Sequence, residues 1–231
     1  YSGYALGLAK GAALGQRLLA DAVRTGATAG STRRLGILGS DLALSRSPRI
    51  HPQPFDRIEL PACASLGQFL DALRPLYRGL AVTSPFKREA AQQVDTALPA
   101  VNTLVARDGA WQGFNTDVEG ARATLLALQA TEVTVLGDGG VTESLRLASE
   151  DLGVRLEVVR RAEAPRKLRG AVVWTWPAGL SGPKRLSREG ARVALVSYGQ
   201  AARDIEREVV RRGGRPLRLG PRWFVAQARA Q

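Results

Sequence analysis

The residues best suited to chemistry lie in three short segments of the chain, 82–87 (VTSPFK), 100–104 (AVNTL) and 113–117 (GFNTD). They include one lysine, Lys87, and one aspartate, Asp117, together with amide and hydroxyl side chains. An amine near a carboxylate can remove the proton of a hydroxyl group as a hydride leaves the same carbon. The segments therefore predict a site for a polyhydroxylated small molecule, with a surface salt bridge between Lys87 and Asp117 as the alternative.

A glycine-rich turn follows the apolar run 133–136 and precedes a helical pattern at 141–152. Its three glycines are Gly137, Gly139 and Gly140. Between a strand and a helix, such glycines let the backbone approach a diphosphate, and the helix N-terminus offers N–H groups to it. Asp138 and Glu143 are unfavourable neighbours for a polyanion. The turn predicts a dinucleotide site, with a tight structural connection as the alternative.

Two arginines, Arg160 and Arg161, follow the next predicted strand at 154–159. At this position an acidic residue binds the ribose diol of NAD, whereas an arginine suits the 2′-phosphate of NADP. We therefore expect NADP as the cofactor, with chance placement in an arginine-rich chain as the alternative. A polyol site beside a nucleotide site is typical of a dehydrogenase.

The composition excludes several other classes of protein. The chain has 231 residues and a formal charge of +12, but the basic residues are spread along it and aromatic residues are not interleaved with them. We therefore expect no nucleic-acid partner. No apolar run is long enough to cross a bilayer, so we expect no membrane partner either. With one cysteine and one histidine, we expect no metal and a cytoplasmic location. We also expect a small-molecule substrate and a monomer or homodimer.

The elements that must position these residues alternate between strand and helix patterns. Strands are predicted at 34–39, 57–60, 79–83, 103–107, 110–113, 133–136, 154–159, 171–174 and 191–197. Helices are predicted at 12–24, 65–76, 87–94, 118–130, 141–152 and 201–212. Asp108-Gly109 is a strong hairpin signal. The alternation predicts an α/β protein whose second half is a doubly wound parallel sheet.

The joint order of these segments resembles the motifs of the shikimate dehydrogenase family. The segments that resemble its substrate domain are 45–48 (SRSP) with His51, 79–87, 100–104 and 113–117. The 137–140 turn and Arg160-Arg161 resemble its NADP loop and phosphate-binding arginine, and 176–180 (WPAGL) and 196–198 (VSY) resemble two later stretches. Gly220 and Gln227 resemble its C-terminal glycine and its substrate-binding glutamine. Among the departures, Ala81 stands where the family has asparagine and Phe86 where histidine is common.

The resemblance implies reversible, NADP-dependent oxidation of shikimate to 3-dehydroshikimate, with Lys87 and Asp117 as the catalytic pair. It implies that Ser45 and Ser47 hold the substrate carboxylate, and that Thr83, Asn102 and Gln227 bind around the ring hydroxyls. It implies that Gly137, Gly139, Gly140, Arg160 and Arg161 bind the cofactor and that Gly220 approaches the nicotinamide carboxamide.

The implied fold is an N-terminal α/β substrate domain joined to a doubly wound Rossmann-type NADP-binding domain. We expect a helical extension at 1–33, a substrate domain at 34–118 completed by a helix at 221–231, and the NADP domain at 119–220. Two alternatives remain at this stage. One is a quinate/shikimate dehydrogenase paralogue, and the other is a homologue that binds polyols without catalysis, an idea motivated by Asp138 in the glycine turn.

Overall fold

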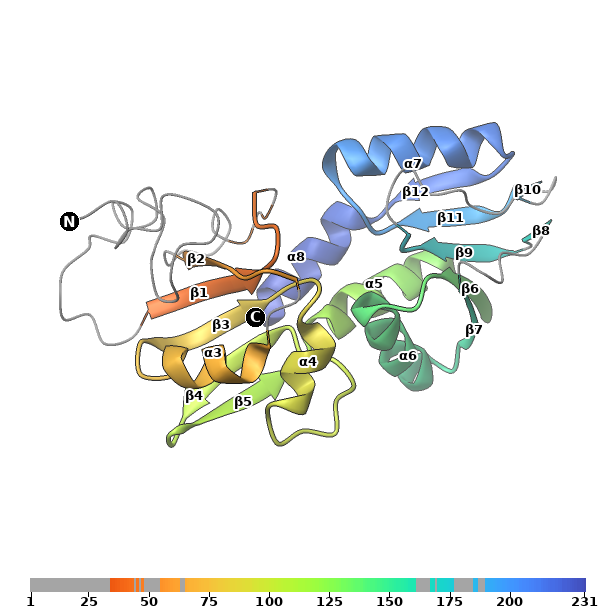
Figure 1. Ribbon diagram of the computed structural model, residues 1–231. Helices are drawn as coiled ribbons and strands as arrows, with labels where there is room; N and C mark the ends of the chain where they lie inside the picture. The colour runs from red at the N-terminus through yellow and green to blue at the C-terminus, as the bar shows by residue number, and fades with distance from the viewer. Residues whose placement is uncertain are drawn as a thin grey trace. The chain divides into compact units, whose positions relative to one another are not determined.

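The structure is a computed structural model that describes residues 34–43, 45, 47, 55–62, 65–160, 167–168, 170–176, 185–186 and 190–231. The helix predicted at 12–24, the 177–180 stretch, His51 and Arg161 lie outside the described residues. The chain divides into two compact units, residues 1–115 and 116–231, whose elements are labelled in Figure 1.

The first unit is built on a five-stranded mixed sheet in the order β2-β1-β3-β4-β5. Its strands are β1 (Arg34–Gly39), β2 (Phe55–Glu59), β3 (Tyr77–Val82), β4 (Thr103–Arg107) and β5 (Ala110–Phe114). Strands β2, β1 and β3 run parallel, whereas β4 pairs antiparallel with both β3 and β5. The predicted hairpin is confirmed, because Asp108 and Gly109 both adopt positive φ angles, 51° and 76°, between β4 and β5.

Two helices, α3 (Leu66–Leu73) and α4 (Lys87–Gln92), pack against one face of this sheet. Both are shorter than predicted. The helix predicted at 65–76 ends at Leu73. Arg74 still has helical backbone angles, but Pro75 has no N–H with which to continue the helical hydrogen bonds. Trp111 of β5 closes this core by donating its indole N–H to the Leu70 carbonyl at 2.9 Å.

The second unit contains a five-stranded sheet in the order β12-β11-β9-β6-β7, in which every pair is parallel. Its strands are β6 (Glu132–Leu136), β7 (Arg155–Val159), β9 (Ala171–Trp174), β11 (Arg192–Leu195) and β12 (Arg215–Arg218). A short parallel pair is formed by β8 (Lys167–Leu168) and β10 (Arg185–Leu186). The sequence did not predict β12, whose residues RPLR are only half-buried or exposed and show no apolar run.

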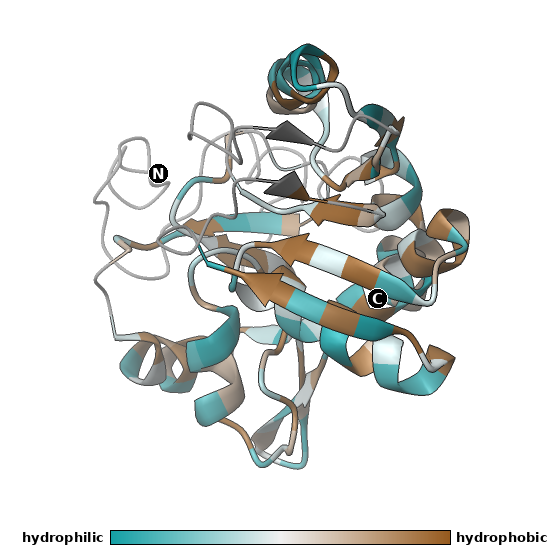
Figure 2. Ribbon diagram, turned by 90° about the vertical axis from the view of Figure 1, so that its right-hand side faces the viewer, coloured by the Kyte–Doolittle hydropathy of each residue, from teal (hydrophilic) through white to brown (hydrophobic). Residues whose placement is uncertain are grey.

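Helices cover both faces of the second sheet, which confirms the doubly wound fold. They are α5 (Asp117–Leu128), α6 (Gly140–Leu152), α7 (Gly199–Arg211) and α8 (Gly220–Ala230). Alternate strand residues face opposite sides, so Val133 and Val135 join the core under α5, α6 and α8, while Leu136 joins the core under α7. Figure 2 shows strands coloured mostly hydrophobic and helices that carry both colours.

None of the helices in the described part of the chain combines the length and the apolar character needed to cross a membrane.

Candidate functional site

Most of the predicted substrate residues follow or precede strands at one end of the first sheet, the end where β1 and β3 finish. We call this end the edge of the first sheet. The carboxyl end of β1 lies beside that of β3, and the start of β4 lies beside the ends of β3 and β5. Ser45 and Ser47 follow β1, Thr83 and Lys87 follow β3, and Asn102 precedes β4. The topology therefore brings segments that are far apart in sequence to one edge of the sheet.

Backbone and side-chain contacts hold the loops at this edge. Thr83 donates its backbone N–H to the Leu38 carbonyl at 2.9 Å, which extends the pairing of β3 with β1. A Cβ atom on Gly39 would lie 2.4 Å from Cγ2 of Thr83. The absence of a side chain at Gly39 therefore lets the Thr83 loop pack closely against the end of β1.

Asn102 is a buried amide at the centre of this edge. Asn102 is 2% exposed. Its backbone carbonyl accepts the Val82 N–H at 2.7 Å, and its backbone N–H donates to the Phe114 carbonyl at 3.0 Å. Its side-chain Oδ1 accepts the hydroxyl of Thr103 at 3.0 Å. Asn102 thus joins β3 to β5, and the hydrogen bonds set the direction of its side-chain amide.

Lys87 begins α4 and is half-buried. Its backbone carbonyl accepts the Val101 N–H at 2.8 Å, which ties the start of α4 to the segment that carries Asn102. The neighbouring Phe86 is 1% exposed and anchors the helix start in the core. The structure therefore brings the 82–87 and 100–104 segments together, as the sequence indicated.

Asp117 lies in the second unit, where it is the first residue of α5 and is 3% exposed. The indole N–H of Trp223, on α8, donates to Oδ1 of Asp117 at 3.4 Å. The ring of Trp223 fits against α5 because Gly120 has no side chain, and a Cβ there would lie 2.7 Å from the indole. Sequence reasoning missed Trp223, since 106 residues separate it from Asp117.

Lys87 and Asp117 fall in different units, so their action as a pair stays a prediction. Gln227, also predicted to bind substrate, follows Trp223 by one turn of α8 and is half-buried. Residues four apart share a helix face, so Gln227 lies on the side of α8 that carries Trp223. Its assignment to the first domain likewise stays a prediction, because α8 groups with the second unit and contacts α5 there.

The glycine turn follows β6 at the carboxyl edge of the second sheet. Its neighbours on either side are β7 and β9, so the strand order reverses here, which is where open α/β sheets bind ligands. Gly137 has a φ of +128°, and a Cβ on it would lie 2.2 Å from Oγ1 of Thr175. Thr142 fixes the turn by donating its hydroxyl to the Gly137 carbonyl at 2.9 Å. Both threonines are supports that the sequence did not predict.

At the same edge, the backbone of Gly220 makes the closest approach to another backbone segment. A Cβ atom there would lie 2.0 Å from the carbonyl oxygen of Ser197, in the loop after β11. The N–H of the preceding Leu219 donates to the Leu195 carbonyl at 3.1 Å. The start of α8 is thereby held against the end of β11. Nearby, the ring of Tyr198 packs against that of Phe224, with the ring centroids 5.7 Å apart.

A comparison with models of known protein families gave no match. The shikimate dehydrogenase (NADP(+)) of Hyphomonas neptunium is 30% identical to this chain over 241 aligned positions, covering 85% of this chain and 89% of that protein. The chain belongs to the shikimate dehydrogenase family.

Other family members match a shorter part of the chain. The enzyme of Bordetella petrii is 33% identical over 150 residues, and the chain spans 52% of its length. The enzyme of Anaeromyxobacter sp. is 33% identical over 158 residues, and the chain spans 57% of its length.

Solved structures of shikimate dehydrogenases share the fold. The Mycobacterium tuberculosis enzyme is 25% identical with a TM-score of 0.63, and the match covers 86% of this chain and 91% of that one. The Thermus thermophilus enzyme, in complex with NADP(H) and shikimate, is 22% identical with a TM-score of 0.67 and coverage of 85% and 90%.

The second unit offers open space and buried donors at the position where this family's fold binds a dinucleotide. A Cβ on Gly139 would meet no atom of the described residues within 4 Å, so these residues leave the backbone before α6 accessible to a ligand. Among the described residues, the indole nitrogens of Trp174 and Trp176 are buried and have no hydrogen-bond partner, and Trp176 lies against Gly137. The loop and its surroundings therefore fit a dinucleotide.

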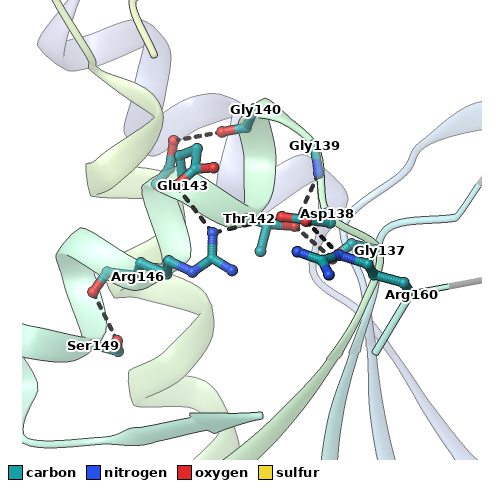
Figure 3. Close-up of polar contacts among 10 residues, drawn as sticks. Gly137, Asp138, Gly139, Gly140, Thr142, Glu143, Arg146, Ser149 and Arg160 are labelled. Carbon is teal, nitrogen blue, oxygen red and sulfur yellow. Dashed lines mark hydrogen bonds and ion pairs between the residues drawn. The ribbon is translucent and has the colours of Figure 1, made fainter. Parts of the chain in front are cut away.

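The charged residues of the loop are paired with one another. Nε of Arg160 donates to Oδ2 of Asp138 at 3.0 Å, as Figure 3 shows. The sequence predicted Arg160 as a cofactor residue and Asp138 as an unfavourable one, but it did not predict that the two would bind each other. Within the described residues, no group of three or more histidine, cysteine, aspartate or glutamate side chains is placed to hold a metal ion.

Proposed function

We propose that this chain catalyses the reversible NADP-dependent oxidation of shikimate to 3-dehydroshikimate. The observation that carries the proposal is the convergence of Thr83, Lys87 and Asn102 at one end of the first sheet in a member of the shikimate dehydrogenase family. The relatives carry this activity in their names, and the Thermus thermophilus structure contains both NADP(H) and shikimate.

The residues at the edge of the first sheet match the chemistry of the substrate. Shikimate is a ring acid with three hydroxyl groups, so it needs donors for a carboxylate and partners for hydroxyls. The hydroxyls of Ser45 and Ser47 donate to the carboxylate, and Thr83 and Asn102 bind the ring hydroxyls. Asn102 supports this role because it is buried and its Oδ1 is already engaged by Thr103, which orients its amide group as a donor.

Lys87 moves the proton of the reacting hydroxyl. During oxidation its amine accepts that proton while the carbon loses a hydride, and during reduction its ammonium group returns the proton to the new alkoxide. Lys87 stands at the start of α4 next to the buried Phe86, and its backbone carbonyl is tied to the segment that carries Asn102. We infer that Asp117 acts with Lys87 as the catalytic pair, and the indole N–H of Trp223 orients the Asp117 carboxylate.

The second unit holds the cofactor. NADP⁺, when bound, supplies the hydride acceptor. The backbone of Gly139 and Gly140 binds the diphosphate at the start of α6, Arg160 and Arg161 bind the 2′-phosphate, and Gly220 admits the carboxamide end of the dinucleotide. The open space beside Gly139 supports this assignment.

The decisive experiment is a steady-state assay of NADP⁺ reduction at alkaline pH, followed at the absorbance of NADPH. Shikimate and quinate serve as substrates in parallel, and each is repeated with NAD⁺. We expect turnover with shikimate and NADP⁺ in clear preference to the other three combinations. A higher kcat/KM with quinate would instead identify a quinate/shikimate dehydrogenase.

One observation favours a second function, a protein that binds the polyol without oxidising it. Asp138 places a carboxylate within the loop that must accept the cofactor diphosphate. Calorimetric titration with shikimate separates this function from the enzyme. Tight shikimate binding without turnover for any substrate and cofactor pair would establish the binding protein and refute catalysis.

The remaining proposals concern the cellular setting. We infer a cytoplasmic enzyme of aromatic amino acid biosynthesis that is a monomer or homodimer, supported by the family and by a sequence with a single cysteine. Sedimentation velocity measures the assembly state, and a mass corresponding to a tetramer would refute this part of the proposal.

A further inference from the structure

Four charged side chains form a compact cluster around the glycine turn of the second unit (Figure 3). Besides its bond to Arg160, the carboxylate of Asp138 lies 3.5 Å from Nη1 of Arg146, measured at Oδ1. The same Nη1 lies 3.1 Å from Oε2 of Glu143. Asp138 is therefore placed between two guanidinium groups, one from α6 and one from the end of β7.

The exposure of these groups shows which of them a ligand can reach. The side chain of Asp138 is 20% exposed, whereas that of Arg160 is 64% exposed. Arg160 is thus an accessible cation whose Nε is held by a mostly covered carboxylate. Any anion that approaches Arg160 from solvent meets a guanidinium group that already has a partner.

The cluster lies where this fold binds the diphosphate and the adenosine ribose of a dinucleotide. The Gly137 N–H donates to the Val159 carbonyl at 3.0 Å, so Asp138 and Arg160 continue directly from two neighbouring backbone segments. In this fold the diphosphate binds at the N-terminus of the helix after the first strand, and the adenosine ribose binds at the end of the second. Asp138 lies at the diphosphate position, and it contacts Arg160, which lies at the ribose position.

The formal charges of the cluster cancel. Asp138 and Glu143 contribute two negative charges, and Arg146 and Arg160 contribute two positive charges. A phosphate monoester such as the 2′-phosphate of NADP⁺ carries about −1.5 to −2 charges near pH 7. It therefore has to share Arg160 with a carboxylate that repels it, whereas the 2′-hydroxyl of NAD⁺ meets no such repulsion.

We propose that Asp138 is an internal counter-ion of Arg160 that weakens binding of the 2′-phosphate and so narrows the preference of this chain for NADP⁺ over NAD⁺. This inference rests on the proposed function, since it assigns the glycine turn to a nicotinamide dinucleotide. It makes Asp138 a residue that determines cofactor specificity through the position and charge of Arg160.

The test is calorimetric titration of the whole chain with NADP⁺ and, separately, with NAD⁺ at fixed ionic strength. Asp138→Asn removes the charge and keeps the shape of the side chain. We expect it to tighten NADP⁺ binding roughly tenfold more than NAD⁺ binding. The diphosphate is common to both cofactors, whereas only NADP⁺ places a phosphate beside Arg160, and the interaction of two charges at a partly exposed site corresponds to a change in affinity of this order. An unchanged or smaller ratio of the two affinities would overturn the proposal.

A matched control removes one carboxylate charge at the far end of α6, the helix that follows the glycine turn. Asp151→Asn lies in the last turn of α6, where Asp151 pairs with Arg122 at 2.6 Å. We expect both affinities to stay within about twofold of those of the unmodified chain, because Asp151 lies about three helical turns, roughly 17 Å, from the start of α6 and its charge is screened by solvent. A gain in NADP⁺ affinity equal to that of Asp138→Asn would show a general charge effect and overturn the proposal.

A double-mutant cycle with Arg160→Ala tests whether Asp138 acts through that arginine. If it does, Asp138→Asn changes the ratio of NADP⁺ to NAD⁺ affinity much less in the Arg160→Ala background. An equal change in both backgrounds would refute the counter-ion role. Failure of NADP⁺ and NAD⁺ to bind to any variant would refute the proposed function, whereas normal binding with an unchanged ratio would refute this inference alone.

Discussion

Substitution of Gly137 by alanine separates the structural role of the glycine turn from its role in cofactor binding. The new Cβ would lie 2.2 Å from Oγ1 of Thr175. The backbone φ of Gly137 is +128°, an angle that residues other than glycine rarely adopt. A strained backbone of this kind costs about 1–3 kcal/mol. Displacing Thr175 also breaks its 2.7 Å hydrogen bond to the Leu136 carbonyl, at a cost of about 1 kcal/mol. We therefore expect Gly137→Ala to lower the free energy of unfolding by about 2–4 kcal/mol.

Urea unfolding followed by circular dichroism measures this loss, and a thermal scan should show Tm lower by roughly 6–15 °C. Gly139→Ala is the matched control, because its Cβ would meet no atom within 4 Å and its φ of −116° suits any residue. We expect Gly139→Ala to leave the free energy of unfolding within about 0.5 kcal/mol. It should nevertheless weaken NADP⁺ binding at least tenfold, because its methyl group occupies the space that the diphosphate needs.

Two results would refute this reasoning. The first is a Gly137→Ala variant as stable as the unmodified chain, which would show that Thr175 and the backbone adjust without cost. The second is a Gly139→Ala variant that binds NADP⁺ normally, which would show that the diphosphate does not approach this backbone. Thr175→Ala in combination with Gly137→Ala should recover about 1 kcal/mol relative to the sum of the single variants, since it removes the obstructing hydroxyl.

Three further predictions concern the catalytic and cofactor residues. Lys87→Ala should lower kcat by about a thousandfold while shikimate affinity, measured by calorimetry, stays within about threefold; a near-normal kcat would remove Lys87 as the proton carrier. Trp223→Phe keeps the aromatic ring against Gly120 but removes the donor to Asp117, so kcat should fall about fivefold with KM unchanged; a change in KM alone would contradict a positioning role. Arg161→Ala should weaken NADP⁺ binding much more than NAD⁺ binding in calorimetric titrations, and equal losses would show that this arginine does not bind the 2′-phosphate.

The local pattern of the chain was sufficient to predict most of both sheets. Apolar runs such as 133–136 and 171–174 match β6 and β9, and Asp108-Gly109 gives the hairpin between β4 and β5. These signals are local because burial of a strand and the backbone angles of a tight turn depend on neighbouring residues. By contrast, β12 carries a proline and arginines and has no apolar run, so only its pairing with β11 reveals it.

Residue types and their order along the chain were enough to establish which chemistry is available: a lysine, an aspartate, amides, hydroxyls and a glycine turn, in the order typical of the shikimate dehydrogenase family. Tertiary structure decided which of these groups touch. The bond from Trp223 to Asp117 and the support of Gly137 by Thr175 join residues on different elements. The pairing of Asp138 with Arg160 likewise depends on the adjacency of β6 and β7. Side-chain partners of this kind depend on the order of the strands in the sheet and on the packing of the helices. Neither can be read from the types and spacing of neighbouring residues.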